Sequence, residues 1–192
     1  MSVEICEASA AVLPAYARVP IAFEIRSVLD ATVQAGGLGG IVLTERALDA
    51  PYHVKDYNLL DGGPEGWARQ FDLSGWGFFA AYNGKNLVGG AAVAFGADDV
   101  DMLERRKDLA VLWDIRVAPE ARGRGVGAAL FGAAAAWAAA RGCRQLKVET
   151  QNVNVPACRF YARQGCVLGG IQRFAYPDLP DEVQLLWYRP LP

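Results

Sequence analysis

The sequence predicts a single domain of the α/β or α+β class, in which a sheet and helices form layers around one core. Two observations carry this prediction. Residues 77–117 have the pattern of three consecutive strands, and from residue 128 onward helical segments alternate with strands. That order is typical of a sheet covered by helices. The 192 residues, 53% of them apolar, are enough for one hydrophobic core.

The first third of the chain has weaker patterns. Apolar residues fall on alternate positions between Ile21 and Leu29, which predicts a half-buried strand. A glycine-rich break, "QAGGLGG", separates it from a second short strand in "IVLTERAL". Residues 49–75 are rich in loop formers, and we expect one helical turn there, around Glu65–Phe71.

A hairpin and a third strand follow. The dipeptide Asn83-Gly84 stands between the apolar runs Gly77–Tyr82 and Lys85–Phe95, which is a strong hairpin signal. After a charged loop, "LAVLWDIRV" is apolar except for Asp114 and Arg116. The three runs therefore predict an antiparallel meander.

The last third alternates between helix and strand. The alanine-rich run "AALFGAAAAWAAARG" favours a helix, with Gly142 just past its end. The segment "RQLKVETQ" predicts a strand. A second short helix is expected in "NVNVPACRFYARQG", where Asn154 can cap, Pro156 suits the first turn and Gly165 ends the helix. Two further strands, in "CVLGGIQRF" and "EVQLLWYRP", close the chain.

Composition excludes several classes of partner. The net charge is −2 and no basic stripe is visible, which disfavours nucleic acid. Four cysteines without a C-x-x-C pair and the lone His53 do not provide zinc-type spacing, and they suit a reducing compartment. No signal peptide or membrane-spanning run is visible. We expect a cytoplasmic protein without metal, membrane or nucleic-acid partner.

The stretch "VAPEARGRGVGAAL" predicts an anion-binding loop. A strand ends at Val117, glycines follow, and a helix begins. The first turn of a helix has unpaired N–H groups and a partial positive charge, so phosphate oxygens can bind there. The loop consists of Arg122, Gly123, Arg124, Gly125, Val126 and Gly127.

The loop alone leaves several interpretations open. Gly123, Gly125 and Ala128 match the dinucleotide fingerprint G-x-G-x-x-A, and Glu149 ends the next strand, where a ribose-binding acid would stand. Against it, "APEA" separates the strand from the glycines, and an antiparallel hairpin precedes. A P-loop motif is absent. The spacing of Arg122, Gly125 and Gly127 also fits a pyrophosphate loop, R-x-x-G-x-G, and the glycines could instead serve only a close helix–sheet turn.

The surrounding residues carry a family resemblance. The stretch "VAPEARGRGVGAAL" resembles the acetyl-CoA pyrophosphate loop of the GNAT superfamily of N-acetyltransferases, and "NVNVPACRFYARQGC" resembles the later signature of that family. The segments "VETQNVNVPACRFYARQGCVLGG" and "YPDLPDEVQLLWY" are similar to streptothricin acetyltransferases. The resemblance covers about residues 76–190. One departure is Cys166, where the family most often has Phe.

The resemblance implies the GNAT fold, which has a mixed, mostly antiparallel central sheet flanked by helices and a splayed strand pair that binds the cofactor. It implies one domain over residues 1–192. Residues 1–75 would form a variable part on the acceptor side, and residues 76–190 would form the acetyl-CoA-binding core. The reaction implied is transfer of an acetyl group from acetyl-CoA to a primary amine, with CoA as product.

The resemblance also implies roles for individual residues. The pyrophosphate would lie on Arg122–Gly127, and the pantetheine arm would pair with Ile115, Arg116 and Val117. Asn154 would hydrogen-bond the pantetheine, although a plain helix cap is the alternative. Tyr161 would be the general acid, because a phenol with a pKa near 10 keeps its proton at neutral pH and can give it to the departing thiolate. Its alternative is an ordinary core aromatic.

The general base is left open between two carboxylates. An alkyl amine is mostly protonated at pH 7, so it needs a base or a water relay. Asp114 stands in the apolar strand before the loop, and Glu149 ends the next strand. Either could instead form an ion pair with Arg116 or Arg144. Tyr176, between the last two strands, could line the acceptor site.

The expected function is acetylation of a small aminated molecule, such as a streptothricin-like or other aminated antibiotic. The alternatives are acetylation of a peptide or protein amine or of a polyamine, or an acyl-CoA sensor without turnover. A nicotinamide oxidoreductase is a further rival from the dinucleotide interpretation. The final strands, where their edges are unpaired, could pair in a homodimer.

Overall fold

The computed structural model describes residues 3–50, 54–58 and 63–192. The chain consists of two compact units, each assembled from separate segments. Unit 1 contains residues 1–21, 56–147 and 189–192, and unit 2 contains residues 22–55 and 148–188.

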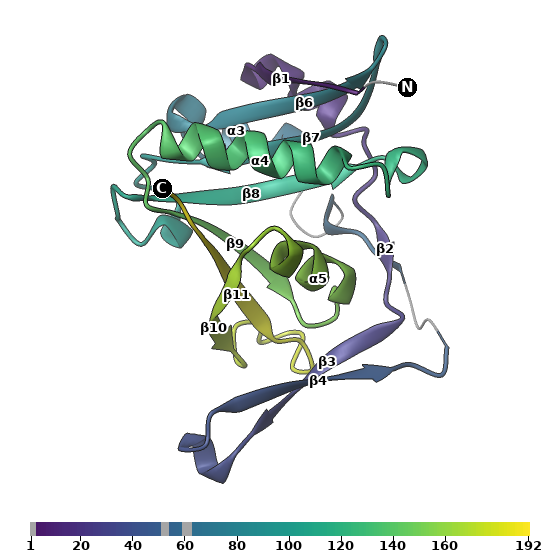
Figure 1. Cartoon of the computed structure of the whole chain (residues 1–192), viewed down its shortest axis with the longest axis vertical. Helices are drawn as coiled ribbons and strands as arrows, with labels where there is room; N and C mark the ends of the chain where they lie inside the picture. The colour runs from purple at the N-terminus through teal and green to yellow at the C-terminus, as the bar shows by residue number, and fades with distance from the viewer. Residues whose placement is uncertain (1–2, 51–53, 59–62) are drawn as a thin grey trace. The chain divides into compact units, whose positions relative to one another are not determined.

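Unit 1 contains the predicted meander and its covering helices (Figure 1). Its strands run in the order β1-β6-β7-β8-β9, antiparallel except for the parallel pair β8 and β9. The elements are β1 (Glu4–Ala8), α1 (Leu13–Tyr16), α3 (Pro64–Gln70), β6 (Gly77–Asn83), β7 (Asn86–Ala94), β8 (Leu109–Val117), α4 (Val126–Ala139) and the first residues of β9 (Gln145–Gln151).

The hairpin prediction is confirmed, with its turn shifted by one residue. Asn83 pairs with Asn86, so the two loop residues are Gly84 and Lys85 rather than Asn83 and Gly84. Gly84 has a φ of 62°. A positive φ at the first loop position is typical of type II′ hairpin turns, which explains why glycine stands there.

Helix α4 covers one face of the sheet of unit 1. Its buried residues recur every three or four positions, from Val126 through Leu130 and Ala134 to Trp137. This face packs against β6, β7 and β8 (Figure 1). The many alanines let the helix axis lie close to the strands. Within the described ranges, no helix is long and apolar enough to cross a membrane.

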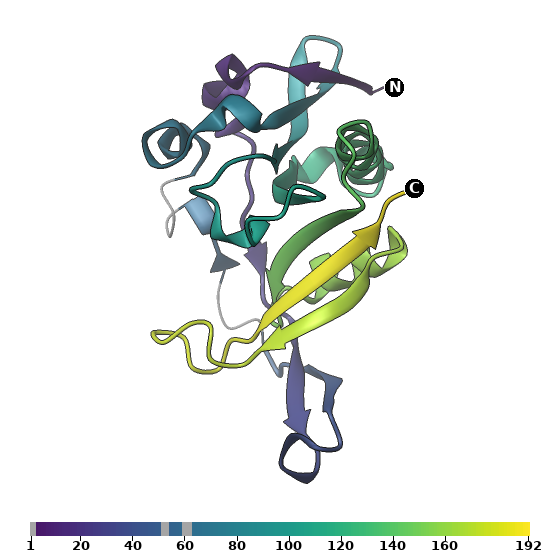
Figure 2. The same cartoon turned by 90° about the vertical axis from the view of Figure 1, so that its left-hand side faces the viewer.

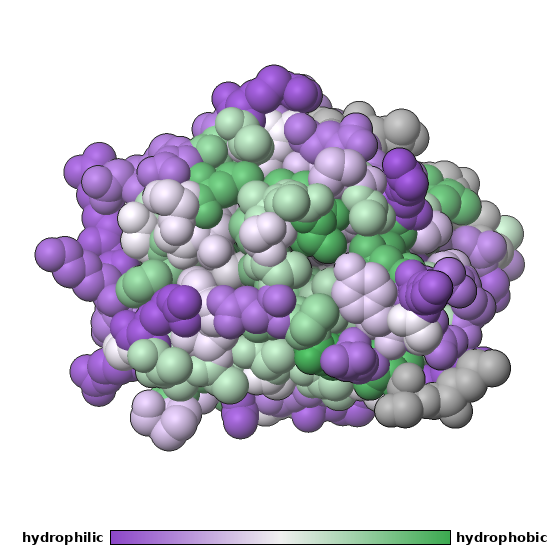
Figure 3. All heavy atoms as spheres, turned by 90° about the horizontal axis from the view of Figure 1, so that it is seen from above, coloured by the Kyte–Doolittle hydropathy of each residue, from purple (hydrophilic) through white to green (hydrophobic). Residues whose placement is uncertain are grey.

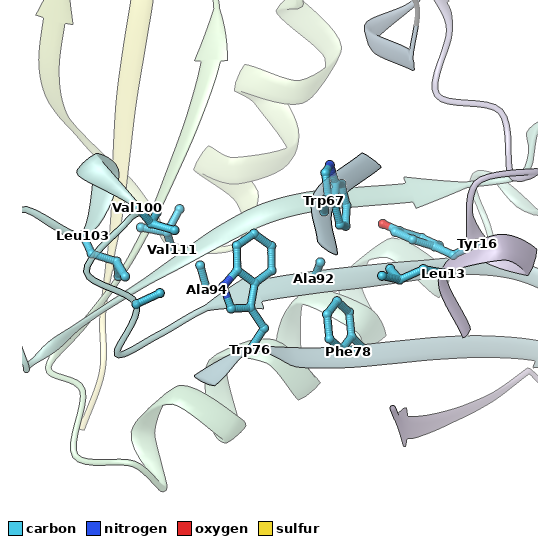
Figure 4. Packing of buried hydrophobic residues seen from close by; sticks show 11 residues of the cluster. Leu13, Tyr16, Trp67, Trp76, Phe78, Ala92, Ala94, Val100, Leu103 and Val111 are labelled. Atoms are coloured by element: carbon cyan, nitrogen blue, oxygen red, sulfur yellow. The ribbon is translucent and has the colours of Figure 1, made fainter. Parts of the chain in front are cut away.

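The opposite face carries an aromatic cluster (Figure 4). Tyr16, Trp67, Trp76 and Phe78 are buried, and ring contacts connect them in sequence. Gly90 of β7 makes room for Tyr16, because a Cβ at this glycine would lie 2.6 Å from the Tyr16 ring. The glycine therefore allows a tyrosine from α1 to lie across β7.

Strand β8 has a bulge and a partly unpaired edge. Ala92 of β7 pairs with Asp114, but the next residue, Val93, pairs with Leu112. Trp113 is therefore the extra residue of a β-bulge. Pairing of β8 with β9 covers only Leu109 to Val111. In the described part of the chain, the rest of β8 has β7 as its only paired strand.

Strand β1 and helix α1 were not predicted. The run "EICEA" is short and half-polar, and Glu4 and Glu7 are exposed. It pairs with β6 and forms the edge of the sheet of unit 1. A view from this side shows apolar areas interrupted by hydrophilic residues (Figure 3). Charged side chains on an edge strand oppose pairing with other chains.

Unit 2 contains the end of β9, helix α5 and several strand pairs (Figure 2). Strand β11 lies between β9 and β10, and β2–β5 and β3–β4 form two further antiparallel pairs. The elements are β2 (Phe23–Glu24), β3 (Ser27–Val33), β4 (Ile41–Ala47), β5 (Val54–Lys55), α5 (Val155–Arg163), β10 (Val167–Gln172) and β11 (Gln184–Pro190).

The expectation of one strand from Ile21 to Leu29 is wrong. The segment forms β2 and β3, which pair with different partners, β5 and β4. Ile25, between the two strands, is fully buried against Val28 and Val153. The alternation of apolar residues thus continues from β2 into β3 although the two strands pair with different strands. Periodicity alone does not reveal where the pairing changes.

Candidate active site

The glycine loop has the geometry of an anion-binding turn. Gly123 and Gly125 have φ values of 73° and 82°, a conformation that residues with side chains rarely adopt. Gly125 caps α4, and its carbonyl accepts the bond from Ala129 at 3.0 Å, so the N–H groups before Ala129 precede the helical ladder. The short 3-10 turn Pro119–Ala121 stands between β8 and the glycines. A dinucleotide fingerprint requires a tight turn directly after the strand, so this loop does not have that geometry.

The side chain of Arg122 contributes to the loop itself. Its Nε donates to the carbonyl of Val117 at 2.9 Å, which ties the loop back to the end of β8. Arg124 is exposed and borders a hollow of about 390 Å³ next to the loop. The hollow is lined by Val3, Ile5, Asn83, Val88, Glu120, Ala121, Arg124, Gly125, Val126 and Ala129.

The predicted pantetheine residues Ile115, Arg116 and Val117 lie in the last part of β8, after the bulge. Their partners in the described chain are on β7. In the described chain the other edge of β8 has no paired strand over these residues, and such an edge can accept an extended ligand as an added strand. The carbonyl of Val117 already accepts from Arg122.

Asp114, one of the two candidate bases, lies in a buried polar cluster. Arg116 donates to both carboxylate oxygens of Asp114, from Nε at 2.9 Å and from Nη2. The hydroxyl of Tyr16 also donates to Asp114 and lies 3.2 Å from the carbonyl oxygen of Gly90. The sequence left open whether Asp114 is a base or forms an ion pair with an arginine, and the structure shows the ion pair with Arg116. Three donors occupy its oxygens, so Asp114 is poorly placed to accept a further proton.

Arg116 connects several segments to β8. Its Nη1 donates to the carbonyl of Val19 at 3.3 Å and to Oδ1 of Asn58 at 3.1 Å. The guanidinium also lies 4.9 Å from the ring centre of Tyr16. Its side chain is 2% exposed. The side chain of Arg116 is therefore committed to this cluster, and its backbone pairs with Gly90 of β7.

Burial determines the protonation of Tyr16. Removal from water raises the pKa of its hydroxyl well above the ordinary value, and the negative charge of Asp114 raises it further. Tyr16 is therefore a permanent hydrogen-bond donor at neutral pH.

Glu149, the second candidate base, has neutral donors among its partners in unit 2. Tyr176 donates its hydroxyl to Glu149, and Nε2 of Gln151 lies 3.0 Å from the same carboxylate oxygen. Gln151 also donates to the oxygen of Tyr176 at 3.2 Å. Burial raises the pKa of Tyr176 above its ordinary value, and the charge of Glu149 adds to this. Tyr176 therefore keeps its proton for Glu149.

Helix α5 positions the other two predicted residues of unit 2. Oδ1 of Asn154 accepts from the N–H of Ala157 at 3.2 Å, which makes it the N-cap, as the sequence pattern allowed. Tyr161 is 6% exposed, and its ring packs edge-on against Phe160, with ring centres 5.4 Å apart.

The predicted site residues thus fall into two groups. Unit 1 holds Asp114, the pantetheine strand and the glycine loop, and unit 2 holds Glu149, Asn154 and Tyr161. Sequence reasoning missed Tyr16, Asn58 and Gln151. The Gly89-Gly90 pair inside β7 was the available signal for Tyr16, since glycine in a strand often marks a close approach.

No metal site is visible in the part of the chain that the structure describes. No group of three or more His, Cys, Asp or Glu side chains in it could hold an ion. The only histidine of the sequence, His53, lies outside the described residues.

The chain is similar to proteins of one family. The model of the family described as "Acetyltransferase (GNAT) family" matches residues 43–166. A streptothricin acetyltransferase of Escherichia coli is 32% identical over 169 residues, 86% of this chain and 84% of its own length. The crystal structure of a nourseothricin acetyltransferase matches with a TM-score of 0.78 and 27% identity over all of both chains.

A second solved structure has the same fold. It is a Bacillus anthracis protein in complex with acetyl coenzyme A, with a TM-score of 0.77 and 24% identity, covering 99% of this chain and 100% of that one. The family match spans well over half of the chain, and strand β8, the loop and helix α5 stand where the sequence predicted a strand, a loop and a short helix. The chain belongs to the GNAT family of acetyltransferases, and its reaction is acetyl transfer from acetyl-CoA to an amine.

Proposed function

We propose that this enzyme acetylates an amino group of streptothricin or a closely related aminated antibiotic. The observation that carries the proposal is the 32% identity to a streptothricin acetyltransferase over 86% of the chain, which extends into the residues before the family core. The likeness to the nourseothricin enzyme over the whole chain points the same way. A mildly acidic protein also suits a cationic substrate.

For the cofactor, elements of unit 1 would hold the pyrophosphate, the pantetheine arm and the thioester carbonyl of acetyl-CoA. The pyrophosphate would accept hydrogen bonds from the N–H groups at the start of α4, helped by the helix dipole. The pantetheine arm would pair with the free edge of β8 from Ile115 to Val117. The thioester carbonyl would receive an N–H of the bulged part of β8, which stabilises the negative charge that develops on its oxygen.

For the proton transfers, the contacts of Asp114 disfavour it as the base, which leaves Glu149 as the candidate. The oxygens of Asp114 receive donors from Arg116 and Tyr16, and the ion pair is buried. The hydroxyl of Tyr176 and the amide of Gln151 donate to Glu149 and orient its carboxylate. Tyr161 would give its proton to the departing CoA thiolate. Asn154 would add a hydrogen bond from its amide nitrogen to the pantetheine.

The test of this proposal is steady-state kinetics with acetyl-CoA and streptothricin. Tyr161→Phe is expected to lower kcat by about 10²–10⁴-fold, the usual worth of a general acid, with the Kd of CoA unchanged. Tyr82→Phe removes a hydroxyl from β6 and is the matched control. Equal turnover of Tyr161→Phe and wild type would remove Tyr161 from the mechanism.

The role of Glu149 as general base can be tested by the pH dependence of the rate. Glu149→Gln cannot take a proton, so its rate should depend on the small fraction of amine that is already neutral. That fraction grows tenfold per pH unit below the amine pKa of about 10.4, so activity should recover as the pH rises. A uniform loss at every pH would contradict the assignment.

Substrate choice is tested in parallel. Streptothricin, a polyamine, and a peptide with a free N-terminus are compared by kcat/KM under the same conditions. We expect kcat/KM to be higher for streptothricin than for the polyamine or the peptide. A higher value for the peptide or the polyamine would move the enzyme to one of the alternative acceptor classes.

The homodimer stays a prediction. Strand β10 is the last strand in the order β9-β11-β10, and Val167 on it is 59% exposed. An edge of this kind can pair with a second copy. Sedimentation equilibrium of the wild type against Val167→Lys tests it: the wild type should show a dimer that the charged variant weakens.

A further inference from the structure

The bulge in β8 is anchored by two consecutive side chains. Trp113, the extra residue, packs against Phe71 and Trp76, with ring centres 5.0 Å and 5.4 Å away. Asp114, the next residue, is bound by Tyr16 and Arg116. A bulge leaves backbone groups outside the regular ladder. Side-chain contacts on both bulge residues therefore help to fix the direction of those groups.

The contacts of Asp114 with Tyr16 and Arg116 form the polar anchor of the bulge. This anchor costs free energy, which indicates that the position of Asp114 matters for function. It buries a charged pair, with the side chains of Arg116 and Asp114 only 2% and 8% exposed. It also requires glycine at position 90, since any larger residue would collide with Tyr16. Apolar residues could fill such a space without the loss of hydration that a buried ion pair entails.

We infer that Tyr16 is a positioning residue for acetyl transfer: through Asp114, together with Arg116, it holds the bulged segment of β8 so that its backbone N–H polarises the thioester carbonyl. This inference rests on the proposed use of β8 as the cofactor strand. Tyr16 reaches the strand from α1, and its hydroxyl contacts β8 at Asp114.

If Tyr16 positions the bulge, loss of its hydroxyl should lower turnover without weakening the binding of CoA. In the described chain, the hydroxyl of Tyr16 contacts Gly90 and Asp114 and not the loop Arg122–Gly127. We therefore expect CoA to bind with or without this hydroxyl. A bulge that is free to shift would present its N–H at the wrong place when negative charge develops. Small displacements of a catalytic group cost large factors in rate.

The variant that isolates this role is Tyr16→Phe. It removes one hydroxyl and leaves the Arg116–Asp114 pair in place, so no buried charge loses its counter-charge. We expect kcat to fall about 10-fold or more, while the Kd of CoA stays within about twofold of wild type. Tyr82→Phe should change neither quantity. Arg116→Lys keeps the charge but not the two-pronged contact, and it should show the same split between kcat and Kd.

A measurement without turnover keeps this inference separate from the identity of the acceptor. Acetyl-CoA labelled with ¹³C at the thioester carbonyl is bound to each variant in the absence of any amine. In wild type, a polarised carbonyl should resonate downfield of free acetyl-CoA, and in Tyr16→Phe the resonance should move back toward the free position. An unchanged resonance and unchanged kcat in a folded Tyr16→Phe would overturn the inference. Inactivity of the wild type on streptothricin, with the resonance shift intact, would contradict the proposed acceptor and leave the positioning role supported.

Discussion

At the scale of single residues, the two candidate bases differ in what surrounds them. Asp114 has a guanidinium and a phenol as donors, whereas the donors to Glu149 include a phenol and an amide. The buried ion pair with Arg116 gives Asp114 a structural role.

The Arg116–Asp114 pair yields a stability prediction. Arg116→Met leaves a buried carboxylate without its counter-charge and should lower the free energy of unfolding by about 3–5 kcal/mol. The double variant Asp114→Asn/Arg116→Met removes both charges and keeps an acceptor for Tyr16, so it should be more stable than the single variant. Urea unfolding of wild type and both variants measures this. A double variant that is the least stable would show that the pair is net stabilising by itself.

Cys158 yields a prediction on pH. Burial raises the pKa of its thiol to about 12, and the thiol donates to the carbonyl of Gln151. In the unfolded chain the thiol ionises near pH 9, so above that pH the unfolded state binds fewer protons than the folded state. Stability is therefore fully present below about pH 9 and is lost between about pH 9 and 12.

The measurement compares wild type with Cys158→Ala. The free energy of unfolding, followed by urea titration from pH 8 to 11, should fall more steeply in wild type than in the variant. Parallel curves would mean that the thiol ionises equally in both states.

At the scale of elements, the glycine loop and α4 offer a matched pair of substitutions. Gly125 has a φ of 82°, so Gly125→Ala forces a side chain into the left-handed region at a cost of about 1–2 kcal/mol. Gly132 lies inside α4 without a positive φ, and a Cβ added there would meet no atom within 4 Å. Gly132→Ala should therefore stabilise the fold by about 0.5–1 kcal/mol. Both changes add one methyl group.

Gly125→Ala and Gly132→Ala also distinguish an effect on stability from an effect on acetyl-CoA binding. Gly125→Ala should weaken acetyl-CoA binding, because it disturbs the N–H groups at the start of the helix, and Gly132→Ala should leave it unchanged. Isothermal titration calorimetry gives both affinities. Equal binding by the two variants would mean that the loop does not hold the cofactor.

Elements with strong local signals were predictable, and those fixed by tertiary contacts were not. β8 and α5 follow the sequence pattern closely, because a continuous apolar run, a cap, a proline and a glycine define them locally. β1 was missed because its half-polar run becomes a strand only by pairing with β6. The role of Asp114 also depends on Tyr16, 98 residues away, which no local pattern reveals.

At the scale of the whole molecule, ligand linkage tests the choice of cofactor. A ligand that binds only the folded state stabilises it by about 2.7 kcal/mol at 100 times its Kd. For a chain of this size that raises Tm by about 5–10 °C. Acetyl-CoA and CoA should produce this shift, and NAD should not. A shift with NAD alone would revive the dinucleotide interpretation of the glycine loop.

Acetylation of streptothricin by the purified enzyme can be measured directly. The purified enzyme, acetyl-CoA and streptothricin are incubated together, and the products are analysed by mass spectrometry alongside a thiol assay for free CoA. We expect streptothricin to gain the mass of one acetyl group in step with CoA release, and Tyr161→Phe to slow both. Release of CoA without acetylated streptothricin, or no reaction while another amine is acetylated, would contradict the proposed function.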